Sequence, residues 1–209
     1  TAGAVNFATG VTVASEGSLT LDGTTGGLVG AGTLDLDAKT GITLNDNLTT
    51  AGTTDINADS DGTGGVGTLT LAAGKTLSTT NNILTITAED LDISGTSITS
   101  GSAKTTITDS DNNGIGLGAT ASTNGLDVSV AELTKITGAD VEFVSAGNID
   151  VNGLTAASTA TISGTLILDS AADVNFVTGA STTTNGLTVE ADNQVDIDVA
   201  ITTTAGNLS

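Results

Sequence analysis

Apolar and polar residues alternate in short bursts along the whole chain. Each burst is an apolar–x–apolar triplet with Thr, Asp or Asn usually in the middle, so one face is apolar and the other polar. This period of two predicts a short β-strand with one buried face. The triplets begin at Val11, Leu19, Leu34, Ile42, Leu69, Leu84, Leu91, Ile115, Leu126, Val141, Ile149, Leu166, Val174, Leu187 and Val195.

The segments between the triplets are rich in Gly, Asn, Asp, Ser and Thr, which form turns. Pairs such as Asn152-Gly153 can also close antiparallel hairpins. The spacing favours parallel stacking, because triplets begin alternately about 8 and about 13 to 15 residues apart, and two steps give one solenoid coil of roughly 20–23 residues. We therefore predict an all-β parallel β-helix with about 9–10 coils. Parallel crossovers are right-handed by general rule, so we expect a right-handed coil.

The two ends of the chain resemble each other. Val5–Gly10 reads VNFATG and Val174–Gly179 reads VNFVTG, and neither end looks like a polar cap. We expect residues 1–209 to form one solenoid that continues into further repeats or stacks head-to-tail on other copies. The longest irregular stretches, 23–32 and 94–108, are modest. We therefore expect no inserted binding subdomain.

The composition limits both the core and the possible partners. The 209 residues include no Cys, His, Met, Pro, Trp or Tyr and only 3 Phe, so Leu, Ile, Val and Ala must fill a narrow core. The formal net charge is −20, with 4 basic residues against 24 acidic ones, which excludes binding to nucleic-acid phosphates. No run of 18 apolar residues occurs, so we expect no membrane insertion.

Several segments resemble the repeats of filamentous-haemagglutinin-like proteins and of autotransporter passenger domains. They are Gly41–Gly52 (GITLNDNLTTAG), Gly67–Gly74 (GTLTLAAG) and Ala146–Gly153 (AGNIDVNG). The resemblance covers the whole chain and implies a right-handed β-helix repeat region of a large bacterial surface protein. It also implies a location outside the cell or on its surface, and roles in adhesion, aggregation or envelope coating. The partners that it implies are copies of the same solenoid, the cell envelope or glycans.

Two acidic loops match the start of a calcium-binding loop. Residues 109–114 (DSDNNG) follow the alternating D-x-[DN]-x-[DN]-G pattern, and residues 57–62 (NADSDG) fit it with Asn57 in the first position; the alternation places oxygen atoms on one side of a loop. The candidate ligands are Asn57, Asp59, Asp61, Asp109, Asp111 and Asn113. A calcium loop of the EF-hand type also needs Glu at position 12, where this chain has Thr68 and Thr120. Wide turns between coils explain the same residues, so Ca²⁺ remains an open alternative and no cofactor is required.

The sequence offers few residues from which a catalytic site could be built. Without His or Cys, the usual pairs of nucleophile and base cannot be built. The four lysines, Lys39, Lys75, Lys104 and Lys135, lie far apart in the sequence. A glycoside hydrolase would need two opposed carboxylates in a cleft, and no Trp or Tyr is present to line it. We expect a non-enzymatic structural fibre, sheath or surface-layer component. The alternatives are an adhesin stalk and, less favoured, a β-helix enzyme acting on carbohydrate.

Overall fold

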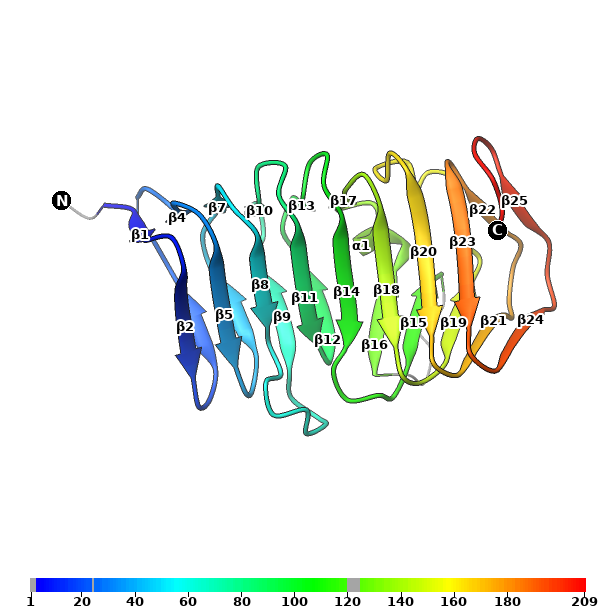
Figure 1. The fold of residues 1–209 in the computed structure, drawn as a ribbon, viewed down its shortest axis with the longest axis horizontal. Coiled ribbons are helices and arrows are strands. Elements are labelled where there is room, and N and C mark those ends of the chain that lie inside the picture. The colour runs from blue at the N-terminus through cyan, green and yellow to red at the C-terminus, as the bar shows by residue number, and fades with distance from the viewer. Residues whose placement is uncertain (1–2, 24, 120–124) are drawn as a thin grey trace.

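The computed structural model describes residues 3–23, 25–119 and 125–209 and shows a parallel β-solenoid with three strands in most coils (Figure 1). In Figure 1 the near strands run downwards and the far strands return upwards while the chain advances from left to right, which makes the coil right-handed. The all-β parallel fold predicted from the triplets is therefore confirmed.

The strands stack into three faces, which we call A, B and C. Face A contains β1 (Val5–Phe7), β4 (Leu28–Gly30), β7 (Leu48–Thr50), β10 (Thr76–Ser78), β13 (Ser97–Thr99) and β17 (Ile136–Thr137). Face B contains β2 (Val11–Ser15), β5 (Leu34–Ala38), β8 (Thr54–Asn57), β11 (Leu84–Ala88), β14 (Thr105–Asp109), β18 (Val141–Ser145), β20 (Thr165–Ser170) and β23 (Gly186–Ala191).

Face C begins as one sheet and continues as a second. The first sheet contains β3 (Leu19–Leu21), β6 (Ile42–Leu44), β9 (Thr68–Leu71) and β12 (Asp90–Ile93). The second contains, in spatial order, β16 (Leu126–Ser129), β15 (Ile115–Gly118), β19 (Ile149–Asn152), β21 (Asp173–Phe176) and β24 (Gln194–Ile197). A separate pair, β22 (Ser181–Thr183) and β25 (Ile201–Thr203), lies at the C-terminal end.

The solenoid has about eight coils, as the 8-stranded sheet of face B shows, and not the 9–10 expected. The reason is that three coils are longer than the predicted period, one of them only slightly, since Val141 pairs with Leu166, 25 residues later. Leu34 pairs with Thr54, 20 residues later. In contrast, Thr54 pairs with Leu84, 30 residues later, and Thr105 pairs with Val141, 36 residues later.

One of the long coils contains an insertion. β16 follows β15 in the chain but lies between β12 and β15 in space: it pairs with β15, and the amide of Asp127 donates a 3.3 Å hydrogen bond to Oδ1 of Asp90. A single helical turn, α1 (Val130–Leu133), follows with a capping box formed by Ser129 and Glu132. The alternating spacing of about 8 and 13 to 15 residues therefore does not hold here, because the triplets at Ile115 and Leu126 lie 11 residues apart and pair with each other. The stretches 23–32 and 94–108, expected to be irregular, contain β4, β13 and β14.

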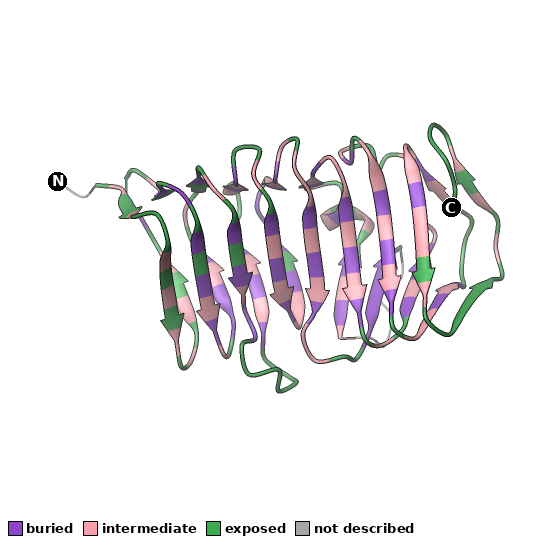
Figure 2. Cartoon of the chain, in the orientation of Figure 1, coloured by how far each residue is buried: buried purple, intermediate pink, exposed green. Residues whose placement is uncertain are grey.

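Alternate side chains of each strand form the core. On face B, inward residues stack directly above one another from coil to coil. This row is Val13, Leu36, Ile56, Ile86, Ile107, Phe143, Leu168 and Val189. Figure 2 shows the resulting alternation of buried and more exposed residues along the middle strands. Leu36, Ile56 and Phe143 are fully buried, whereas Val13 and Val189, at the two ends of the row, are only partly buried.

Small hydroxyl residues turn the chain between faces A and B. The side chains of Thr50 and Thr54 are buried, and their hydroxyl oxygens lie 2.6 Å apart. Two corners further along the solenoid, Thr105 donates a 2.8 Å hydrogen bond to the buried Ser100. Paired hydroxyls satisfy each other in an environment that excludes water.

Candidate functional site

The two acidic loops predicted as calcium loops meet in space. Residues 58–67 link β8 to β9 and residues 110–114 link β14 to β15, at the corner between faces B and C. Between them, β11 turns directly into β12 through Glu89, whose carboxylate accepts a 2.8 Å hydrogen bond from the amide of Gly65. The longer loop thus crosses this short turn and reaches the next loop, where the hydroxyl of Ser110 donates a 2.6 Å hydrogen bond to Asp59. We call Asp59, Asp61, Asp109 and Asp111 the acidic junction.

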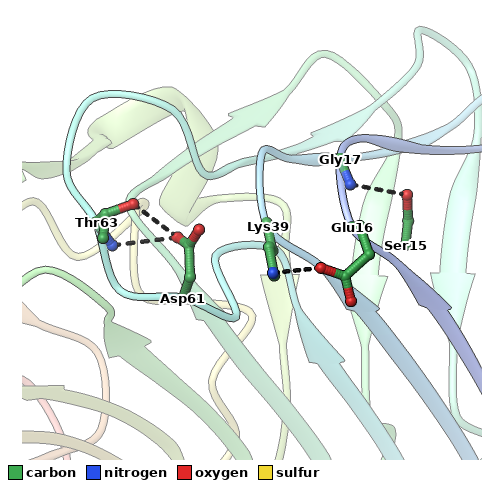
Figure 3. A network of polar contacts seen from close by, with 6 residues as sticks. All are labelled: Ser15, Glu16, Gly17, Lys39, Asp61 and Thr63. Carbon is green, nitrogen blue, oxygen red and sulfur yellow. Dashed lines mark hydrogen bonds and ion pairs between the residues drawn. The ribbon is translucent and has the colours of Figure 1, made fainter.

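Some of the predicted ligands shape their own loop. Asn57 Oδ1 accepts a 3.2 Å hydrogen bond from the amide of Asp59. Asp61 Oδ1 accepts from Thr63 twice, at 3.3 Å from the amide and at 2.8 Å from the hydroxyl (Figure 3). These contacts are typical of turns in which a side chain caps its own backbone.

The second loop repeats this arrangement. Asp111 Oδ1 accepts a 3.2 Å hydrogen bond from the amide of Asn113, whose side-chain amide also donates to Asp111 Oδ2. Of the two position-12 residues, Thr68 begins β9, and Thr120 lies outside the described residues. Turn formation therefore explains Asn57, Asp61, Asp111 and Asn113 without a ligand.

Asp59 and Asp109 differ from the other four residues because they are buried. The two residues are 2% and 3% exposed. Asp109 Oδ2 accepts 2.9 Å hydrogen bonds from the amide of Gly114 and the hydroxyl of Ser145. Within the described residues, Oδ1 of Asp59 and Oδ1 of Asp109 are buried with no hydrogen-bond partner. Sequence analysis gave no reason to include Ser110 and Ser145, because each is distant in the chain from the aspartate that it contacts.

Burial controls the protonation of these carboxyls. It raises the pKa of Asp59, although the hydrogen bond from Ser110 acts in the opposite direction, and the charges of Asp61 and Asp111 raise that pKa further. Burial also raises the pKa of Asp109, and Asp111 adds to the effect. The pKa of Asp61 is instead lowered, first by the hydrogen bond from Thr63. Asp111 therefore acts on both buried carboxyls and links the two loops electrostatically.

The lysines leave the buried carboxylates without a counter-ion. Lys39 forms an ion pair with Glu16 and lies near enough to Asp61 to lower its pKa (Figure 3). Lys75 pairs with Asp46 at 2.9 Å, Lys104 pairs with Glu142 at 2.8 Å, and Lys135 donates to the carbonyl of Ile93. As far as the chain is described, no lysine is paired with Asp59 or Asp109.

Over residues 3–23, 25–119 and 125–209, no three acidic side chains are already grouped as they would be around a metal ion. In the same ranges, no helix is long and apolar enough to cross a membrane.

Comparisons with known proteins find no matching family model, no matching curated protein and no matching solved structure. The architecture is that of a β-helix repeat region. The likeness to filamentous-haemagglutinin-like proteins remains a resemblance in sequence.

Proposed function

We propose that this chain is a structural segment of an extracellular fibre, sheath or surface layer, and that its coils continue into neighbouring coils. The observation that carries the proposal is that inward apolar residues are exposed or only partly buried at both ends of the solenoid. In the first coil, the inward residues Phe7, Val11 and Leu19 are only partly buried. At the other end, Val195 and Ile197 are 42% and 56% exposed, although their positions in the middle coils are buried.

The C-terminal end face is also hollow and apolar. A cavity of about 220 Å³ opens there between Phe176, Val189, Ile201 and Leu208. The outer strands of a parallel stack leave backbone amides and carbonyls without a partner, so an exposed end recruits further strands. A neighbouring coil, on the same polypeptide or on another copy, would cover the apolar surface and pair these strand edges.

Electron microscopy of the purified chain tests the proposal. From the first to the last strand of face B, one chain should measure roughly 35 Å, at about 4.8 Å per strand. We expect longer rods at high protein concentration, with lengths in multiples of this unit. Ile197→Asp should shorten the rods, because it places a charge on the end face. Ile83→Asp is the matched control, since Ile83 is 50% exposed but lies in a turn of a middle coil. Rods that stay single at every concentration, or that Ile197→Asp leaves unchanged, would contradict self-stacking.

A second function, an adhesin stalk, is favoured by one specific feature. The insertion of β16 and α1 interrupts the regular coils, and insertions in repeat proteins often lie on the face that binds a partner. A glycan array separates the two functions. Saturable binding to a defined glycan, lost when residues 119–129 are replaced by a short Gly-Ser linker, would favour the adhesin. Absence of binding would favour the structural role, and an assay for the release of reducing ends would test for an enzyme.

A further inference from the structure

Asp109 occupies a position where the other coils have small residues. At the corner where face B ends, the inward residues of the earlier strands are Ser15, Ala38 and, in β11, Ala88, and Ala88 is the direct neighbour of Asp109. The later strands place Ser145 and Ser170 there. A carboxylate in this row of small residues lies against the core, where desolvation disfavours its charge.

Two buried carboxylate oxygens at this corner have no hydrogen-bond partner among the described residues. Asp59 and Asp109 each bind donors with Oδ2 only: Ser110 in the first case, Gly114 and Ser145 in the second. The Oδ1 atom of each is buried without a donor. Buried polar atoms are nearly always satisfied, because leaving one unpaired has a substantial cost in stability.

The charge around these two oxygens is negative. Asp61 and Asp111 both raise the pKa of Asp59, and Asp111 also raises that of Asp109, so Asp111 acts on the buried carboxyl of each loop. Lys39 is already paired with Glu16. A bound cation would offset this negative charge and take contacts from the two buried oxygen atoms, whereas a proton shared between Asp59 and Asp61, or between Asp109 and Asp111, is the competing way to satisfy them.

We propose that the acidic junction binds one divalent cation, Ca²⁺, between the two loops, with Oδ1 of Asp59 and Oδ1 of Asp109 as ligands. Ca²⁺ takes six to eight oxygen ligands in a flexible geometry and uses backbone carbonyls and hydroxyls as well as carboxylates. The site joins two coils that are separated by the coil of β11, and is not two separate calcium loops as the sequence pattern alone would place it.

The acidic side chains are not grouped around one point in the described residues, so binding must draw the two loops together. Asp61 and Asp111 are well placed to move, since both lie in loops and are not buried. The ion would thereby tie the coil containing β8 to the coil containing β14, past the short turn at Glu89. The site does not depend on whether the chain functions in a fibre or in an adhesin.

Calorimetric titration of the full 209-residue chain with CaCl₂ at neutral pH, after treatment with EDTA, tests the proposal. We expect saturable binding of one ion per chain and a higher melting temperature in its presence. Asp59→Asn and Asp109→Asn should each weaken binding by at least about tenfold. The matched control is the pair Asp35→Asn and Asp55→Asn, which removes two stacked carboxylates from the exposed side of face B. These variants should retain binding.

The opposite results are equally clear. If Ca²⁺ does not bind in saturable fashion, or if Asp59→Asn and Asp109→Asn bind it as the wild type does, the proposal is wrong. Circular dichroism of each variant shows whether it keeps its strands. If a buried variant fails to fold, Asp61→Asn and Asp111→Asn provide the test from the exposed side of the junction, and unchanged binding in both would overturn the proposal. If the wild type ignores Ca²⁺ while Asp59→Asn raises the melting temperature, a proton or water satisfies the buried oxygen and no cation site exists.

Discussion

The hydroxyl of Ser110 donates a 2.6 Å hydrogen bond to Oδ2 of Asp59, although 51 residues separate the two in the chain. This contact joins loops that belong to different coils and gives the buried Asp59 carboxylate its donor. Side chains make this link, whereas successive coils are otherwise joined mainly by backbone hydrogen bonds between their strands.

Removal of this link should destabilise the solenoid locally. Ser110→Ala leaves both oxygens of Asp59 without a donor, so we expect a loss of about 1–3 kcal/mol in the free energy of unfolding. Urea denaturation measures the loss, and hydrogen exchange should show faster opening of residues 58–67. Ser60→Ala is the control, because Ser60 is exposed in the same loop. Equal stability of the two variants would show that the Ser110 contact contributes nothing.

The acid response of the buried carboxyls should be opposite to that of ordinary ion-paired aspartates. Burial raises the folded-state pKa of Asp59 and Asp109 above 3.8, so between 3.8 and the raised values the folded chain binds more protons than the unfolded chain. Their contribution to stability therefore increases as pH falls through the raised pKa values and is complete below 3.8.

Melting temperatures measured in EDTA from neutral pH down to about 4 test this sign. Because Asp61 has a lowered pKa and acts in the opposite direction, the informative quantity is the difference between the wild type and the Asp59→Asn/Asp109→Asn variant. The melting temperature of the wild type should rise relative to that of the variant as the pH is lowered. A difference that stays constant with pH would contradict the assignment.

The inward row of face B should be most sensitive in the middle of the solenoid. Leu36→Ala removes a fully buried side chain stacked between Val13 and Ile56, and should lower the free energy of unfolding by about 2–5 kcal/mol. Val13→Ala, at the partly buried end of the row, should cost less because its surroundings are already open. Chemical denaturation compares them, and a larger loss for Val13→Ala would be inconsistent with an open end.

The hydroxyl pair at the corner between faces A and B should behave as a unit. Thr54→Val removes the 2.6 Å partner of the buried Thr50 hydroxyl, which keeps only a 3.3 Å hydrogen bond to the carbonyl of Gly52, so we expect a loss of about 1 kcal/mol. The double variant Thr50→Val/Thr54→Val removes both hydroxyls and keeps the shape, so it should recover part of that loss. Additive losses in the thermal unfolding of the three variants would show that the two hydroxyls act independently.

Most strands of faces B and C were predictable because their inward apolar residues recur every second position, but β8 and β14 were not among the triplets, since Thr54 and Thr105 occupy an inward position in them. The triplets at Leu34 and Ile42, for example, became β5 and β6. The strands of face A were missed because most have one inward apolar residue, such as Leu77 in β10 or Ile98 in β13, between Thr and Ser. A single apolar residue cannot show a period of two. These strands form because their backbones pair with strands of the coils on each side.

The site was predicted in part. The sequence pattern identified both loops, because alternating Asp or Asn residues followed by Gly lie within six consecutive positions. The local pattern could not show that Asp109 is buried at the corner of face B. Its burial depends on the pairing of β14 with β11, which places Asp109 beside Ala88 of the preceding coil.

The sequence by itself determined the all-β class, the parallel stacking and the acidic surface, because all three follow from residue type and local period. The tertiary structure alone decided that there are about eight coils, that β16 is inserted next to β12, and that Asp59 meets Ser110. The physical reason is that a strand selects its neighbours by register across coils of unequal length. Contacts between loops 51 residues apart therefore exist only after those registers are set.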